Sequence, residues 1–190
     1  MGLITLRRAL ASDADAIAKL WHASWHAGHG SVRGVQQCLL DDRSLAQFEE
    51  QTPKLLQAGE HIVAESADCS MAGKLAGFVS VDATEVTQIF VEPEQFGKGV
   101  GGTLLAAAED TIAMSSSVVT EGTGIQATVH ALEKNERACR FYAKHGWTAS
   151  DVLDSKIETT LRRPGALHPT LFMHPWRQVR FQKLLALRAG

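Results

Sequence analysis

The sequence lacks the features that mark membrane, secreted and nucleic-acid-binding proteins. Its 190 residues contain no apolar run that approaches the roughly 18 residues of a membrane-spanning helix, and the first residues form no apolar secretion signal. The net charge of −2 gives no general attraction to nucleic acid or anionic lipid. We therefore expect a cytoplasmic protein with neither a membrane nor a nucleic-acid partner.

Cysteine is scarce, and nothing in the sequence indicates a metal site. The three cysteines, Cys38, Cys69 and Cys139, lie far apart in no CxxC or Cys/His spacing, as reduced structural thiols do. His22 and His26 share a helix face at i and i+4, as zinc ligands can, but no third ligand follows at a matching distance. We predict no bound metal.

The composition is that of an ordinary globular protein, because 45% of the residues are hydrophobic and can bury one core. We expect one domain over residues 1–175, followed by a basic amphipathic tail or helix over residues 176–190. A helix there would turn Val179, Leu184 and Leu187 toward the protein and its basic side chains outward. Packing on its own domain or on a second copy is favoured over binding RNA or a membrane.

Hydrophobic periodicity predicts alternating strands and helices. The three strands expected between residues 61 and 91 are joined by short turns, which predicts an antiparallel meander. Residues 27–42 show no clear period and read as a loop, and residues 151–168 read as a long loop or hairpin. The expected strands are 3–8, 61–66, 74–82, 85–91, 125–131, one beginning at 147, and 170–173; the expected helices are 14–25, 44–58, 99–114 and 135–145.

The most informative segment, residues 91–105, joins an apolar strand, a short glycine-rich loop and the start of an amphipathic helix. Glycine has no Cβ, so a run of glycines lets several backbone N–H groups point at one anion and lets a phosphate approach the main chain. The following helix adds unpaired N–H groups and the positive end of its dipole. The segment therefore predicts a phosphate-binding loop over Gly97, Gly99, Gly101 and Gly102.

Two other phosphate-binding motifs fit this segment less well. Gly97, Gly99 and Gly102 have the spacing of the dinucleotide fingerprint, but Pro93 and its neighbours separate them from the strand, and antiparallel strands come before. A Walker loop needs a lysine directly after its last glycine, whereas Lys98 lies earlier.

A second segment, residues 135–147, contains Asn135, Ala138, Tyr142 and Gly146 in a helix that begins with an N-cap and ends at a glycine. Together the two segments resemble the GNAT superfamily of N-acetyltransferases. In that family a Q/R-x-x-G-x-G/A loop holds the pyrophosphate of acetyl-CoA, and an N-x-x-A-x-x-F-Y-x-K-x-G-[FW] helix lies beside the thioester. The resemblance covers about residues 74–147. It departs at one place, because Phe96 stands where Gln or Arg is expected, with Gln95 one place earlier.

The resemblance implies a single-domain α/β (α+β) fold with a mixed, mostly antiparallel central sheet flanked by helices. It implies direct transfer of an acetyl group from acetyl-CoA to a primary amine of a small molecule or peptide in a ternary complex, and it leaves a homodimer open. A non-catalytic acyl-CoA sensor or assembly module with the same fold is the alternative. The cofactor-binding residues carried over are Phe90, Val91, Phe96, Gly97, Lys98, Gly99, Val100, Gly101, Gly102, Thr103, Asn135 and Tyr142.

The resemblance also suggests catalytic roles. Tyr142, the single tyrosine of the chain, lies where the family places the general acid for the departing thiolate, and Glu85 where some members place a carboxylate base. Each has a structural alternative: a core aromatic for Tyr142, a solvated strand residue for Glu85, and an N-cap without cofactor contact for Asn135. Polar and aromatic side chains of the first helix are expected at the acceptor, namely Trp21, Trp25 and His26, with His22 and His29 nearby.

Overall fold

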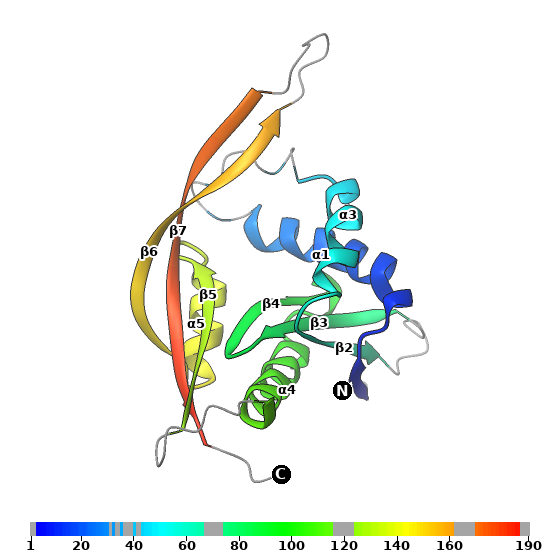
Figure 1. The fold of residues 1–190 in the computed structure, drawn as a ribbon, viewed down its shortest axis with the longest axis vertical. Coiled ribbons are helices and arrows are strands. Elements are labelled where there is room, and N and C mark those ends of the chain that lie inside the picture. The colour runs from blue at the N-terminus through cyan, green and yellow to red at the C-terminus, as the bar shows by residue number, and fades with distance from the viewer. Residues whose placement is uncertain are drawn as a thin grey trace.

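The structure, a computed structural model, describes residues 3–30, 32, 35, 40, 43–66, 74–115, 124–161 and 170–186 (Figure 1). The strands are β1 Ile4–Arg8, β2 Glu60–Ser66, β3 Leu75–Asp82, β4 Glu85–Val91, β5 Ile125–Leu132, β6 Thr148–Leu161 and β7 Thr170–Leu185. The α-helices are α1 Ala14–His29, α3 Leu45–Leu55, α4 Val100–Ser115 and α5 Glu136–Lys144, with short 3-10 turns at Ala11–Asp13 (η1) and Pro93–Gln95 (η3). Within these residues no helix combines the length and apolar character needed to span a membrane.

The strands form one seven-stranded sheet in the order β1-β2-β3-β4-β5-β7-β6. Every neighbouring pair is antiparallel except β4 and β5, which run parallel. The predicted antiparallel meander of β2, β3 and β4 is confirmed, and so is the predicted mixed, mostly antiparallel sheet.

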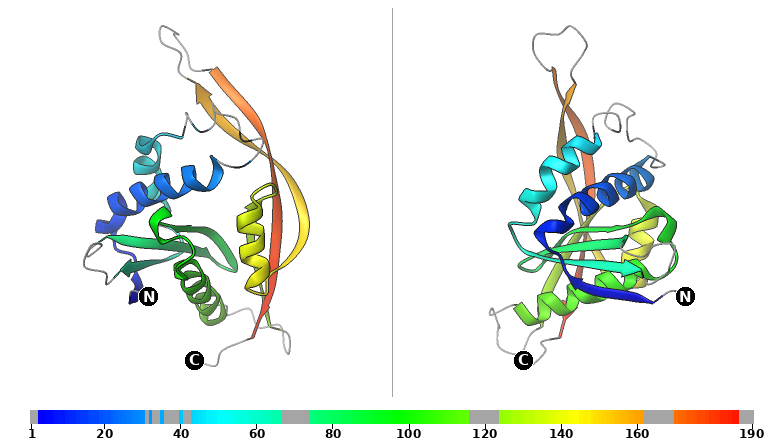
Figure 2. Two further views of the ribbon diagram at one scale, coloured as in Figure 1. Left: turned by 180° about the vertical axis from the view of Figure 1, so that it is seen from behind. Right: turned by 90° about the vertical axis from the view of Figure 1, so that its right-hand side faces the viewer.

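The sheet opens between β4 and β5. These two strands are paired only at Glu85 with Thr128 and at Val86 with Val129. The register between β3 and β4 shifts just after this point, which makes Thr87 the extra residue of a β-bulge. Because a bulge bends its strand, the rest of β4 diverges from β5 and leaves a V-shaped gap in the sheet, as Figure 1 and the left view of Figure 2 show.

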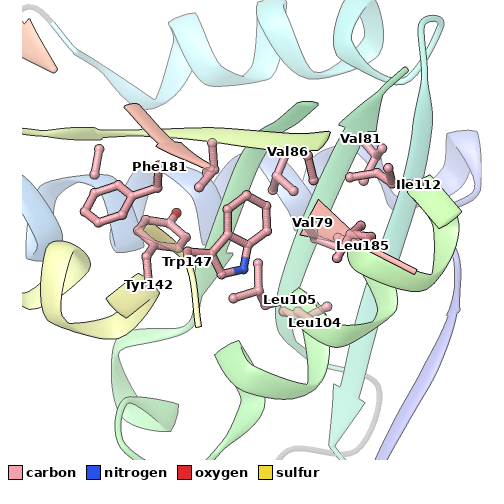
Figure 3. Close-up of a cluster of buried hydrophobic side chains, with 14 of the residues drawn as sticks. Val79, Val81, Val86, Leu104, Leu105, Ile112, Tyr142, Trp147, Phe181 and Leu185 are labelled. Carbon is pink, nitrogen blue, oxygen red and sulfur yellow. The ribbon is translucent and has the colours of Figure 1, made fainter. Parts of the chain in front are cut away.

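Helices cover both faces of the sheet. On one face α4 and α5 enclose an apolar core with β3, β5 and β7, and Figure 3 shows Leu104, Tyr142, Trp147 and Phe181 packed together in it. On the other face α1 packs on β3 and β4, and α3 packs against α1, around a second apolar cluster that includes Trp21, Phe48 and Phe78. The two layers therefore meet the gap between β4 and β5 from opposite sides.

The C-terminal half of the sheet corrects two predictions. The helix expected from residue 176 onward is wrong, because Trp176–Leu185 belong to β7, which lies between β5 and β6 and so is an interior strand. Lys183 hides the period-two pattern, since it points to the buried face and donates to Glu109 of α4. Residues 151–161, which read as loop or hairpin, are the second part of β6, so the hairpin alternative fits.

The helix ends are close to those expected, with two differences. Residues 27–29 extend α1 rather than forming a loop, and most of the expected loop at 30–42 lies outside the described residues. Asp13 occupies the N-cap of α1 without capping it, because its carboxylate accepts hydrogen bonds from Arg7 and from the Leu10 N–H. Gly146 has φ of 81° and ends α5 in the left-handed conformation, as predicted.

Candidate active site

Two cavities approach the gap in the sheet from opposite sides. One, of about 620 Å³, lies among α1, α3, β4, β5 and β7, and the other, of about 490 Å³, lies among the glycine loop, η3, α1, β4 and α5. They share a stretch of wall at the gap, so the two cavities adjoin there. The residues common to both linings are His29, Ile89, Phe90, Asn135, Ala138 and Tyr142.

The smaller cavity contains the glycine loop. Gly97 and Gly99 have φ of 76° and 91°, the left-handed region that glycine adopts without a steric penalty. Gly101 and Gly102 line the cavity at the first turn of α4, and a Cβ on Gly102 would lie only 2.8 Å from Nε2 of His145. The loop thus presents a bare main chain and a helix N-terminus to the cavity, which suits an anion.

The predicted cofactor residues fall into two groups. Phe90, Val91, Phe96, the four glycines, Asn135 and Tyr142 all line the smaller cavity. Lys98, Val100 and Thr103 are not part of that lining: Val100 is 1% exposed in the core, and the Thr103 hydroxyl donates to the Gly99 carbonyl.

Three cationic or titratable side chains of α5 and its C-terminus also line this cavity and were not predicted: Arg137, Lys144 and His145. The Arg137 guanidinium lies 4.1 Å from the centroid of the Phe96 ring. Phe96 stands where the family has Gln or Arg. Because Arg137 of α5 stacks on the Phe96 ring, its guanidinium brings a positive charge to the glycine loop. The N–x–Arg spacing after Asn135 was the signal available in the sequence.

His145 is held in one orientation. Its Nδ1 lies 2.8 Å from the Phe141 carbonyl oxygen, which can only accept, so Nδ1 carries a proton and Nε2 faces Gly102.

Tyr142 and Asn135 lie where the two cavities meet. Tyr142 is 5% exposed and packs against Phe181 and Trp147, and burial, followed by the effect of Cys139, raises its pKa far above the ordinary value. Its hydroxyl therefore keeps its proton. The Asn135 side chain accepts a hydrogen bond of 3.1 Å from the Ala138 N–H, so it is the N-cap of α5 and also lines both cavities. Tyr142 therefore packs in the core and Asn135 caps a helix, and both residues also line the two cavities.

The larger cavity has an aromatic wall and a polar edge. Trp21, Trp25, Phe48 and Trp176 form the wall, so two of the three predicted acceptor residues line this cavity. The third, His26, does not, and its Nε2 lies 2.8 Å from the Arg43 carbonyl oxygen. The polar edge comprises Arg43, Gln51, Glu85, Gln88, His130 and Gln178.

Glu85 lines the larger cavity as part of a chain of polar contacts. Its carboxylate lies 3.0 Å from Nδ1 of His130, and Nε2 of His130 lies 3.4 Å from Nε of Arg180. Since a guanidinium only donates, Nε2 of His130 accepts and Nδ1 donates to Glu85. Glu85 is absent from the shared wall at the gap, and 44% of its side chain is exposed.

His29, at the end of α1, is the remaining polar side chain of the shared wall. Its Nδ1 lies 2.8 Å from the Trp25 carbonyl oxygen, and its ring stacks on the Trp25 indole with centroids 4.6 Å apart. Burial lowers the pKa of His29 below 6.5, and the nearby Arg43, Arg137 and His26 lower it further, against the raising effect of the Trp25 carbonyl.

No group of three or more His, Cys, Asp or Glu side chains in the described ranges could hold a metal ion. The rings of His22 and His26 are 4.4 Å apart and lie off both cavities.

Comparison with known proteins finds a matching family. A family model described as the acetyltransferase (GNAT) domain matches residues 57–149, a range that contains β4, the glycine loop and α5. No curated protein matches the sequence at a significant level.

The fold is shared with solved acetyltransferase structures. A GCN5-related N-acetyltransferase from Rhodopseudomonas palustris superposes with a TM-score of 0.68 at 22% identity, over 97% of this chain and 98% of that one. PaiA N-acetyltransferase from Thermoplasma acidophilum, solved with coenzyme A, gives 0.59 at 17% identity over 96% and 99%. YncA from Salmonella typhimurium, a putative acetyltransferase solved with acetyl-CoA, gives 0.56 at 20% identity over 99% and 97%. Residues 57–149 of this chain therefore match the GNAT acetyltransferase domain, and the chain as a whole has the fold of solved acetyltransferases.

Proposed function

We propose that the protein transfers the acetyl group of acetyl-CoA directly to a primary amine of a small molecule or peptide. The observation that carries this proposal is the wall containing Tyr142 and Asn135, which the glycine-loop cavity shares with the aromatic, polar-edged cavity. Two substrates that enter from opposite faces would meet there, and holding them together lowers the barrier by several kcal/mol.

The smaller cavity fits acetyl-CoA, the co-substrate of GNAT acetyltransferases. Gly97, Gly99 and the N-terminus of α4 offer backbone N–H groups to the pyrophosphate, and Arg137 and Lys144 add positive charge. The coenzyme A and acetyl-CoA complexes of the two structural relatives support this assignment.

The diverging part of β4 fits the rest of the co-substrate. Ile89 to Val91 pair with β3 along one edge, while in the described sheet the pairing with β5 on the other edge ends at Val86. Backbone N–H and C=O groups on that open edge need partners, and a pantetheine arm supplies them in the manner of an added strand. A main-chain N–H there would also polarise the thioester carbonyl, which is where negative charge develops during attack.

Two side chains have roles that follow from their positions. The protonated Tyr142 hydroxyl would donate to the sulfur as the carbon–sulfur bond breaks. The Glu85 carboxylate would draw the ammonium form of the acceptor into the larger cavity. That Glu85 also takes the ammonium proton, as predicted from the sequence, stays a prediction.

The test is release of free thiol from acetyl-CoA across a panel of alkyl amines, arylalkyl amines, polyamines and lysine peptides, with the titration heat of acetyl-CoA binding measured in parallel. Binding together with amine-dependent thiol release supports the proposal. Binding without turnover on any amine would favour the sensor alternative, and absence of binding would contradict the assignment of the glycine loop.

A further inference from the structure

We propose that His29 is the catalytic base that takes the proton from the ammonium group of the acceptor. This inference rests on the proposed function and adds a residue to it. Among the described residues that line both cavities, only His29 and Tyr142 have titratable side chains, and they come from α1 and α5, on opposite faces of the sheet. An acid and a base are both needed where the thioester meets the amine, and these two side chains lie at that place.

The tautomer of His29 suits a base. The Trp25 carbonyl oxygen, 2.8 Å from Nδ1, can only accept a hydrogen bond, so the neutral ring carries its proton on Nδ1. The lone pair is then on Nε2. The ring is also fixed in plane by the Trp25 indole, stacked at 24°, and by the Trp176 ring at a centroid distance of 5.7 Å. Two aromatic rings and a backbone hydrogen bond therefore hold the His29 ring in one orientation.

The charge state of His29 also suits a base. Burial and the positive charges of Arg43 and Arg137, together with His26, disfavour the imidazolium, so the ring is neutral at pH 7. Tyr142 is shifted in the opposite sense by burial and keeps its proton. Two neighbouring groups whose surroundings push their pKa values apart are the pattern expected of a base and an acid.

Glu85 is the rival candidate, and its surroundings differ. It lines the acceptor cavity only, receives a hydrogen bond from His130, and is 44% exposed at its side chain. An exposed carboxylate that lines only the acceptor cavity is better placed to attract the ammonium group of the acceptor than to remove its proton beside the thioester.

Nε2 of His29 takes one proton from the ammonium, and the freed nitrogen lone pair forms a bond to the thioester carbonyl carbon. The carbon–sulfur bond breaks, and the sulfur receives that electron pair and the Tyr142 hydroxyl proton. A second proton leaves the nitrogen as the amide forms and restores Tyr142, and the imidazolium of His29 gives its proton to solvent.

The first arm of the test compares the pH dependence of acetyl transfer for the wild type, His29→Gln and Glu85→Gln with the fastest amine of the panel. The wild-type rate should level off above the pKa of His29, because the enzyme deprotonates the ammonium itself. His29→Gln should lose on the order of 10²-fold in rate at pH 7, with acetyl-CoA affinity within about twofold of wild type. Its rate should keep rising about tenfold per pH unit toward the amine pKa of ~10.4, because only free amine can react.

His22→Gln is the matched control, since His22 lies on the same helix and lines neither cavity, and its rate should stay within about twofold of wild type. The His29→Ala protein should recover rate when imidazole is added, a result that a purely structural role would not produce. A plateau that persists in His29→Gln but disappears in Glu85→Gln overturns the proposal in favour of Glu85.

A second arm needs no acceptor and no variant. Nitrogen NMR of the imidazole rings in wild-type protein saturated with acetyl-CoA should show His29 as the Nδ1–H tautomer at pH 7.5, with Nε2 titrating below pH 6.5. A proton on Nε2, or a charged ring at pH 7.5, overturns the proposal even if the protein proves to be an active acetyltransferase. Failure of the proposed function would appear separately, as absent acetyl-CoA binding or absent thiol release in the wild type.

Discussion

At the scale of single residues, Tyr142 shows how a core position and a reactive position can be the same. Its ring packs on Phe181 at 5.4 Å between centroids, while the residue also lines both cavities. Tyr142→Phe keeps the ring and removes the proton donor. We expect acetyl transfer to fall on the order of 10²-fold while acetyl-CoA binding and the free energy of unfolding stay close to wild type. Thiol release, titration calorimetry and urea unfolding measure the three quantities, and a wild-type rate in the variant would remove Tyr142 from the mechanism.

Gly101 tests the phosphate loop. A Cβ there would lie 3.4 Å from the Phe141 ring and 3.6 Å from Val91, within the wall of the smaller cavity. Gly101→Asp would add a carboxylate beside the pyrophosphate, whereas Gly101→Asn adds the same shape without the charge. We expect Asp to weaken acetyl-CoA binding at least about tenfold more than Asn, by charge repulsion. Calorimetric dissociation constants measure this, and equal affinities for the two variants would place the phosphates elsewhere.

At the scale of elements, Asn135 joins the stability of α5 to the shared wall of the cavities. Its Oδ1 accepts from the Ala138 N–H, so Asn135→Ala should lower the free energy of unfolding by about 1 kcal/mol. Asn135→Asp keeps a capping oxygen and should restore that stability, but it loses the amide donor and adds negative charge near the co-substrate. Urea unfolding together with acetyl-CoA titration separates the two effects. If Asn135→Asp binds acetyl-CoA as wild type does, Asn135 is a cap and nothing more.

Glu109 is the centre of a group of hydrogen bonds that links three elements. Its carboxylate on α4 accepts from Nε1 of Trp147 and from Nζ of Lys183 on β7, each at 2.8 Å, and Lys183 also donates to the His145 carbonyl after α5. Glu109→Ala leaves these donors without their acceptor in a partly buried place, and we expect a loss of about 2 kcal/mol in the free energy of unfolding.

The control for Glu109 is an exposed pair on α5. Arg140 lies 2.9 Å from Glu136, with both side chains more than 70% exposed, at 74% and 78%. Arg140→Ala should change the free energy of unfolding by only about 0.5 kcal/mol. Equal losses for Glu109→Ala and Arg140→Ala would show that the Glu109 contacts do not hold the elements together.

The elements that local sequence determines were predicted well, and those that depend on distant partners were not. The glycine loop, the Asn135 cap and the Gly146 stop are signals contained in a few residues, and each was found at its predicted place. The start of β7 was predicted as a strand over residues 170–173, but its part from Trp176 onward was predicted as a helix because the inward-facing Lys183 breaks the apolar alternation. This partly buried lysine is stable there because Glu109 on another helix and the His145 carbonyl accept its hydrogen bonds.

At the scale of the whole molecule, the site is a property of the sheet rather than of any segment. A bulge at Thr87 opens the sheet, and the opening brings the end of α1 and the middle of α5 to one wall. Sequence patterns placed Tyr142 and the glycines correctly beside the cofactor cavity, yet they gave no reason to choose His29 over His22 or His26. That choice depends on where α1 crosses the gap, which is set by packing on β3 and β4.

Stability toward acid should depend on the ion pair that ties η1 to β1. Arg7 donates to both carboxylate oxygens of Asp13 at 2.7 and 2.9 Å, and this contact, against the effect of burial, holds the pKa of Asp13 below 3.8. A carboxyl whose pKa is lower in the folded state adds stability that is complete well above the unfolded-state pKa and is lost as pH falls toward the folded-state value. Asp13→Asn should therefore destabilise the protein near neutral pH, and the difference from wild type should shrink below about pH 4. Urea unfolding at several pH values measures this, and a difference that stays constant with pH would contradict it.

The position of β7 has a consequence for how the protein is made. Among the described strands β7 comes last in chain order, yet it separates β5 from β6 in the finished sheet, and it is the one described strand with which β6 pairs. During synthesis the edge of β5 that pairs with β7 stays unpaired until the β6–β7 hairpin has emerged and docked as a unit. The contact between Tyr142 and Phe181 of β7 also forms only then. A nascent chain therefore completes the wall around Tyr142 only after the β6–β7 hairpin has emerged, and until then the exposed edge of β5 is open to pairing with other strands.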